Sequence, residues 1–202
     1  DLHGAVAAPG VEAALDVGTG CGIIPIYKRL QGYTNRIVGV EIQKDLYRLA
    51  VKNRELNGYS DLDFRNFDVR RSFRKLSDIL FTVVFSNPPF TRKGTGRKSP
   101  SSSRDMARYE STLDLPGLLR IVSRLLPKKG RFYLIYPVRR LAELIVLAGR
   151  KRLELKRIRF IHPRPGEAPN LFLAEFLKEG GSGVKVEKPL YIFGNSGYTE
   201  EV

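Results

Sequence analysis

Apolar residues fall along this chain in short runs that alternate with amphipathic stretches, a pattern typical of strands and helices in turn. The short apolar runs predict buried strands at residues 11–17, 36–41, 62–67, 79–85 and 130–136. Apolar residues at helical spacing predict helices at residues 23–30, 44–57, 115–126 and 138–149. An alternating stretch at 153–161 and a mostly apolar stretch at 171–177 predict a hairpin with a long, proline-containing loop. Together these elements indicate an α/β fold.

The length of the chain bounds its organisation. One sizeable core fits in 202 residues, whereas two domains would be cramped. We therefore expect residues 1–202 to form one domain, with the glycine-rich start of residues 180–202 leading into a loose C-terminal tail. The chain starts at Asp1 with neither a methionine nor a signal peptide, so we expect that a short N-terminal segment is missing.

Composition narrows the possible chemistry. Cys21 is the single cysteine and there are two histidines, which excludes an intrachain disulfide and argues against a zinc site, so we expect no metal. This cysteine usage fits a reducing compartment, and we expect a cytoplasmic monomer. No apolar run approaches the roughly 18–20 residues that span a membrane.

The formal net charge of +14 is large for a chain of this size. Solubility alone needs a magnitude of roughly 2–8. The excess therefore indicates a polyanionic partner, either nucleic acid or a membrane surface, and we favour nucleic acid.

The run Asp16-Val17-Gly18-Thr19-Gly20-Cys21-Gly22 joins the first predicted strand to the first predicted helix. Glycines let the backbone approach a ligand closely, and a helix N-terminus adds N–H donors, so the run suits a nucleotide-type ligand. The Gly-x-Gly-x-Gly spacing differs from the dinucleotide pattern Gly-x-Gly-x-x-Gly. On its own the run is also compatible with a plain tight turn.

Two acids end the next two predicted strands. Glu41 follows the glycine run at about the spacing where such folds place a carboxylate on ribose hydroxyls, although a surface glutamate is the alternative. Asp68 ends the strand predicted at 62–67. Its carboxylate can accept from an adenine amino group, or it can merely cap the following turn.

The tetrapeptide Asn87-Pro88-Pro89-Phe90 ends the strand predicted at 79–85. Prolines cannot donate to a sheet ladder, and proline restricts the preceding residue to extended conformations. The side-chain oxygen of Asn87 and the carbonyl of Pro88 are thus rigid acceptors for two N–H bonds, and Phe90 can stack on a ring. This set suits a planar group that carries an amino nitrogen, whereas a simple proline turn is the alternative.

A basic, glycine- and serine-rich stretch follows at residues 91–108. The stretch contains one acid, Asp105. Its cationic residues are Arg92, Lys93, Arg97, Lys98, Arg104 and Arg108. A solvated charge run is the usual explanation, but its place beside the proposed reaction centre favours contact with a polyanion. We add Arg164, in the loop of the predicted hairpin, to the residues expected to hold RNA phosphates.

The order of these motifs, each at the end of a strand, resembles the class I S-adenosylmethionine-dependent methyltransferases. The resemblance implies a Rossmann-like, mostly parallel seven-stranded sheet with a C-terminal antiparallel hairpin and helices on both faces. It implies a catalytic box of Asn87, Pro88, Pro89 and Phe90. It also implies S-adenosyl-L-methionine as cofactor, held by Asp16, Gly18, Thr19, Gly20, Gly22, Glu41, Ile42, Asp68, Val69 and Asn87.

Several stretches further resemble the bacterial tRNA (adenine-N6) methyltransferases that modify the adenosine 3′ of the anticodon (position 37) in a valine tRNA. These stretches are residues 40–43, 53–58, 86–90, 94–110 and 170–175. One departure is Phe67, where many relatives have glycine. The resemblance implies tRNA as partner and N6-methyladenine as product.

Other functions remain open at this point. A methyltransferase with the same box can act on a guanine N2 in ribosomal RNA or on a glutamine N5 in a release factor, although the net charge argues against a protein substrate. An RNA-binding module with an inactive cofactor site is an alternative from another class. A dinucleotide-dependent oxidoreductase is disfavoured by the glycine spacing.

Overall fold

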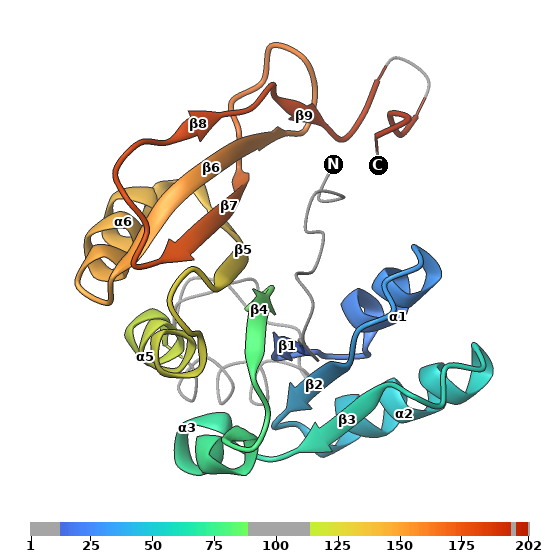
Figure 1. Cartoon of the computed structure of the whole chain (residues 1–202). Coiled ribbons are helices and arrows are strands. Elements are labelled where there is room, and N and C mark those ends of the chain that lie inside the picture. The colour runs from blue at the N-terminus through green and yellow to red at the C-terminus, as the bar shows by residue number, and fades with distance from the viewer. Residues whose placement is uncertain (1–12, 89–113, 195–196, 202) are drawn as a thin grey trace, which may run out of the picture.

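A single sheet runs through the molecule. The computed structural model describes residues 13–88, 114–194 and 197–201 (Figure 1). In this part of the chain the strands are β1 (Ala13–Val17), β2 (Ile37–Glu41), β3 (Asp63–Asn66), β4 (Phe81–Ser86), β5 (Arg131–Pro137), β6 (Leu153–His162), β7 (Leu171–Lys178), β8 (Lys185–Val186) and β9 (Leu190–Tyr191). Their order is β3-β2-β1-β4-β5-β7-β6-β8, and β9 also pairs with β6.

Strands β1 to β5 pair with one another in parallel, whereas β7 is antiparallel to both β5 and β6. The predicted α/β fold, with a mostly parallel sheet and a C-terminal antiparallel hairpin, is confirmed. The described residues add two short strands, β8 and β9, to the seven that we expected.

The helices cover the two faces of the sheet (Figure 1). They are α1 (Ile23–Leu30), α2 (Lys44–Leu56), α3 (Val69–Ser72), α5 (Leu115–Leu125) and α6 (Leu141–Gly149). Helices α1 and α2 bury Ile26 and Ala50 in one apolar cluster. Helices α5 and α6 bury Leu118 and Leu144 in a second cluster. None of the helices in the described ranges is long and apolar enough to cross a membrane.

Alternation along β1 explains how one strand serves both clusters. Leu15 and Val17 belong to the cluster under α5 and α6, whereas Ala14 belongs to the cluster under α1 and α2. Successive strand residues point to opposite faces, so a strand buried on both sides is apolar at nearly every position. This is why the parallel strands appear in the sequence as continuous apolar runs.

The helix predicted at 138–149 begins later than expected. Its first residues form a 3₁₀ turn, Val138–Arg140, before α6. The N–H of Val138 donates to the carbonyl of Asn170 at 3.0 Å, so the chain still follows the sheet at this point and enters the helix only afterwards. The short helix α3 and the 3₁₀ turn Phe73–Leu76 were not predicted, because they are too short for a periodic signal.

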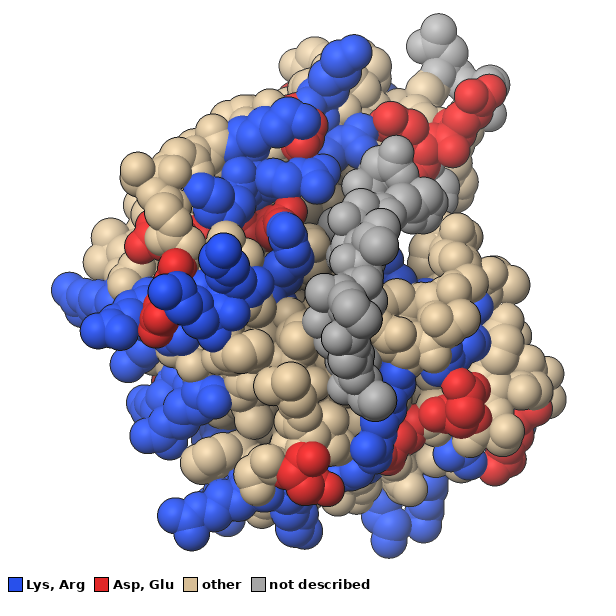
Figure 2. All heavy atoms as spheres, in the orientation of Figure 1, with Lys and Arg blue, Asp and Glu red and all other residues tan. Residues whose placement is uncertain are grey.

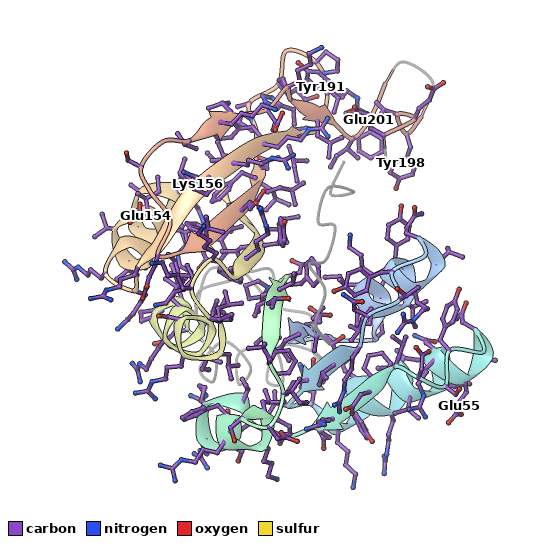
Figure 3. The ribbon with its side chains drawn as sticks, in the orientation of Figure 1. Glu55, Glu154, Lys156, Tyr191, Tyr198 and Glu201 are labelled. Carbon is purple, nitrogen blue, oxygen red and sulfur yellow. The ribbon has the colours of Figure 1, made fainter. Side chains whose placement is uncertain are left out.

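Residues after 180 are more regular than the loose tail that we expected. Strands β8 and β9 pair in parallel with β6, as the red end of the ribbon in Figure 1 shows. Backbone N–H groups of Glu187 and Ile192 donate to the carbonyls of Ile158 and His162. Figure 3 shows Tyr191 on β9 and Tyr198 farther along the same segment. Strands of two residues leave no alternation to detect, so only the folded edge of β6 identifies them.

Candidate active site

The carboxyl ends of β1, β2 and β4 lie side by side in the sheet (Figure 1). From β1 the chain continues to β2 and β3 on one side, and it then returns to place β4 on the other side. Ligands of open α/β sheets bind at such a reversal of strand order, outside the carboxyl ends of the strands. The motifs at residues 16–22, 41 and 87 all belong to these three strands or follow them directly.

Three glycines of the run have a backbone conformation that residues with a side chain rarely adopt. Gly18, Gly20 and Gly22 have φ values of 75°, 57° and 81°, in the left-handed region that favours glycine. A Cβ on Gly22 would lie 2.7 Å from Cζ of Phe64, so Gly22 allows α1 to pack closely on the sheet. A Cβ on Gly20 would meet no atom within 4 Å, so the backbone there faces open space where a ligand can approach.

Glu41 ties the glycine run to the end of β2. Its two carboxylate oxygens accept from the backbone N–H groups of Gly20 and Gln43, at 2.9 and 2.8 Å. Glu41 is 1% exposed, and burial raises its pKa, while the bonds from Gln43, Gly20 and Ile42 lower it in part. Each carboxylate oxygen has a further lone pair, so the group can still accept from a ligand hydroxyl.

Asp16 is the least satisfied polar group of the site. It is 0% exposed, and within the described ranges neither its carboxylate oxygens nor the hydroxyl of Thr19 has a hydrogen-bond partner. Burial raises the pKa of Asp16 to about 7; the nearby Thr19 hydroxyl opposes this rise, and the negative charge of Glu41 adds to it. A buried carboxylate without a partner is costly, and such groups mark functional sites.

Asp68 caps helix α3. Its Oδ1 accepts from the backbone N–H of Arg70 at 2.9 Å, and its carboxylate pairs with the Arg70 guanidinium at 2.8 Å. Burial alone would raise the pKa of Asp68. The hydrogen bonds from Arg70 and the charges of Arg70 and Arg71 outweigh this effect and bring the pKa below its ordinary value. The capping role is therefore present in the structure, and contact with an adenine stays a prediction. The neighbouring side chain of Val69 is buried in the core, so only its backbone can face a ligand.

Asn87 is exposed and directly follows β4, and the next residue, Pro88, is buried. The register places Asp16 opposite Phe85, so the residues after β4 lie across from the glycine run. Pro89 and Phe90 lie outside the described residues, as do Arg92, Lys93, Arg97, Lys98, Arg104 and Arg108. Their predicted roles stay predictions.

Arg164 lies in the loop between β6 and β7, which is at the same edge of the sheet as the carboxyl end of β5. Its guanidinium lies over the ring of Phe193 at 5.2 Å and 3.7 Å from Glu167. Strands β5 and β7 lie between β4, which Asn87 follows, and β6, which precedes Arg164, so Arg164 belongs to the rim of the site and not to its centre.

Two asparagines that we did not predict support the site. Nδ2 of Asn53, in α2, donates to the carbonyl of Cys21 at 2.9 Å and holds the end of the glycine run. Nδ2 of Asn66 donates to the carbonyl of Glu41 at 2.7 Å. Asparagine is unfavourable in the interior of a helix. Its presence at position 53, within a predicted helix, was therefore the signal in the sequence that this side chain has a specific hydrogen-bonding role.

Comparison with known proteins identifies the class. Residues 11–160 match the methyltransferase domain family. A predicted O-methyltransferase from Agrobacterium tumefaciens has a TM-score of 0.72 and 21% identity, over 97% of this chain and 88% of its own. A ribosomal protein L11 methylase from Lactobacillus delbrueckii has a TM-score of 0.60 and 15% identity, over 86% and 73%. These structures support the fold alone. The chain belongs to the class I S-adenosylmethionine-dependent methyltransferases.

Within that class the sequence is similar to particular relatives. The tRNA1(Val) (adenine(37)-N6)-methyltransferase of Porphyromonas gingivalis is 32% identical over 82% of this chain and 65% of its own length. That of Tolumonas auensis is 30% identical, over 81% and 68%. The chain thus spans about two thirds of the length of these relatives, and it belongs to their family.

The residues present fit S-adenosyl-L-methionine, the cofactor of the class. Asp16 and Thr19 supply buried acceptors without a partner, suited to a cationic amino group. The open space at Gly20 admits a ligand against the backbone, and Glu41 retains acceptors for a ribose. Among the described residues no group of three or more His, Cys, Asp and Glu side chains is arranged to hold a metal.

Proposed function

We propose that this chain transfers a methyl group from S-adenosylmethionine to N6 of an adenine in tRNA, at adenosine 37 of a valine tRNA. The observation that carries the proposal is the placement of Asn87, an exposed amide held at the carboxyl end of β4 beside the glycine run. The names of the relatives point to the same reaction, since they are tRNA1(Val) (adenine(37)-N6)-methyltransferases.

The chemistry required of the protein is mainly geometric. The amino nitrogen of adenine is a weak nucleophile because its lone pair is delocalised into the ring. The side-chain oxygen of Asn87 and the carbonyl of Pro88 accept its two N–H bonds. These acceptors favour the pyramidal, positively charged nitrogen that develops during attack. When bound, S-adenosylmethionine would supply an electrophilic methyl group on a sulfonium. The amino nitrogen would form the new N–C bond in line, the sulfur would keep the electrons of the broken S–C bond, and the nitrogen would then lose one proton to give neutral N6-methyladenine.

The target base has to leave its stack before it can reach Asn87. Base flipping costs a few kcal/mol, and less for a loop nucleotide. Phe90 follows the two prolines and is proposed to stack on the flipped base, which returns about 1–3 kcal/mol. Alignment of the amino group with the methyl group then supplies much of the rate.

The charge of the protein suits an RNA substrate. Figure 2 shows many Lys and Arg side chains over the region of β6 and α6, where several pair with acids, as Arg157 does with Glu175 and Glu187. We propose that the basic stretch 91–108 and Arg164 hold phosphates near the reaction centre. Affinity for tRNA should then fall with salt, by roughly 0.7–0.9 in log–log slope for each phosphate neutralised. With tRNA as substrate, the cytoplasm is the proposed location.

A methyl-transfer assay tests the function. Labelled S-adenosylmethionine is incubated with the chain and, in parallel, with total tRNA, ribosomal RNA and a release factor, and labelled RNA is digested to nucleosides. The expected product is N6-methyladenosine in tRNA. Label in guanosine or in protein would be consistent with a class I methyltransferase, but would show that its substrate is not an adenine in tRNA. Absence of label in all three, together with failure of the wild type to bind S-adenosylmethionine in calorimetry, would favour an RNA-binding module with an inactive cofactor site. Absence of label with the cofactor bound would point to an RNA outside the three tested.

A further inference from the structure

One peptide group at the reversal of strand order is held from both sides. The N–H of Gly18 donates to the carbonyl of Val40, in β2, at 2.9 Å. The carbonyl of Val17, in the same peptide group, accepts from the Ser86 hydroxyl, in β4, at 2.9 Å. Because β1 lies between β2 and β4 (Figure 1), this peptide bridges its two neighbours at the point where the glycine run begins.

Ser86 extends the contact between β1 and β4 beyond their backbone pairing. The register of the two strands ends with Asp16 opposite Phe85. Ser86 is the last residue of β4, and it is 3% exposed. Pro88 has no N–H and cannot prolong the ladder. A side-chain hydroxyl therefore supplies the link one residue farther along, in a buried environment where an unmade hydrogen bond is expensive.

We propose that Ser86 is a positioning residue, which holds Asn87 at a set distance from the glycine run through the Val17 carbonyl. Asn87 directly follows Ser86, and Gly18 directly follows Val17. The hydrogen bond from Ser86 to Val17 therefore links Asn87, proposed to hold the amino nitrogen, to the glycine run, proposed to hold the methyl donor. The inference rests on the proposed function, since it assigns Ser86 a part in aligning the same two reactants. In-line transfer is sensitive to such alignment, and a shift of about 1 Å can lower the rate a hundredfold.

The test compares Ser86→Ala with a matched variant, Ser123→Ala. The Ser123 hydroxyl also donates to a backbone carbonyl, that of Lys151, at 2.9 Å, but it lies in α5, on the opposite face from the glycine run's helix. Both variants remove one hydroxyl and one bond donated to a backbone carbonyl. Ser123→Ala also removes the bond that this hydroxyl accepts from Nζ of Lys178, at 2.7 Å. For each, kcat with tRNA, the dissociation constant of S-adenosylmethionine by calorimetry, and Tm are measured.

Ser86→Ala should lower kcat by roughly ten- to a hundredfold. The same variant should retain nearly normal affinity for S-adenosylmethionine, because Gly18 stays bound to Val40. Ser123→Ala should also lower Tm, and it should leave kcat unchanged. An unchanged kcat in Ser86→Ala would overturn the inference. Equal losses of kcat in the two variants would also overturn it, because both would then reflect general stability.

Two further outcomes, an inactive wild type and a Ser86→Ala variant that does not fold, need other measurements. If wild type methylates no RNA, the proposed function fails, and the inference is decided by amide NMR. Ser86→Ala must then shift the Gly18 and Asn87 signals more than Ser123→Ala does, and equal shifts overturn it. If Ser86→Ala does not fold, Ser86→Thr, which keeps the hydroxyl, must retain the kcat of wild type, and loss of kcat overturns the inference.

Discussion

Asp16→Asn should stabilise the cofactor-free protein above neutral pH while weakening its binding of S-adenosylmethionine. The carboxylate of Asp16 is buried without a hydrogen-bond partner among the described residues, and its pKa rises from 3.8 to about 7. Each pKa unit is worth about 1.4 kcal/mol, so the ionised group costs the cofactor-free fold about 4 kcal/mol above pH 7. Asparagine keeps the shape and cannot ionise.

The sign of the pH dependence follows from the two states. Below pH 4 Asp16 is protonated in the folded and the unfolded chain, and its ionisation has no cost. Between about pH 4 and pH 7 the unfolded chain has lost this proton and the folded chain retains it, so the free energy of unfolding falls as pH rises. Above pH 7 both are ionised and the cost is constant. Asp16→Asn removes this dependence.

The assay is urea unfolding of wild type and Asp16→Asn from pH 4 to pH 8. The difference in free energy of unfolding between them should grow across this range by about 4 kcal/mol in favour of the variant. Asp45→Asn, at an Asp whose side chain is 96% exposed, is the control and should show no such growth. A difference between Asp16→Asn and wild type that stays flat from pH 4 to pH 8 would refute the reasoning.

The same substitution should reduce the affinity for S-adenosylmethionine in calorimetry at pH 8. A charge-assisted hydrogen bond to the cofactor's amino group is worth about 1.5–3 kcal/mol, so the dissociation constant should rise by roughly 10- to 150-fold. An unchanged dissociation constant would separate Asp16 from cofactor binding and leave its burial without a functional reason.

Asn87→Ala should abolish methyl transfer and leave cofactor affinity near normal in calorimetry; joint loss of both would point to a structural role. Gly22→Ala should destabilise the fold by about 1–3 kcal/mol in urea unfolding, because its φ is +81° and the new Cβ meets an aromatic ring. Gly20→Ala, which has open space, should cost less stability and more cofactor affinity, and the reverse order would contradict this account. Charge reversal of Arg97 and Lys98 to Glu should weaken tRNA binding and flatten its salt dependence; equal affinity in a filter-binding assay would make both bystanders.

Much of the fold follows from local patterns. The continuous apolar runs around residues 13–17 and 81–86 predict buried strands, since parallel strands are covered on both faces. The glycines at 18, 20 and 22 predict the loop, because all three need positive φ. Helix boundaries are also close to those predicted, as for α1 at Ile23–Leu30.

The elements that the sequence did not reveal are short or depend on distant partners. Strands β8 and β9 have two residues each, and they are defined by pairing with β6 and not by their own alternation. Asp68 was equally compatible with a cap and with a ligand contact, and only the folded positions of Arg70 and Arg71 show that its carboxylate is already paired.

The sequence by itself therefore determined the class of fold, the order of the motifs and the residue types of the proposed reaction centre, because each depends on neighbours along the chain. The tertiary structure decided which polar groups of that centre have partners. It left the carboxylate of Asp16 buried and unpaired, and it brought Ser86 to Val17 across 69 residues of sequence. Such pairings depend on the register between strands that are distant in the chain, and no local pattern encodes that register.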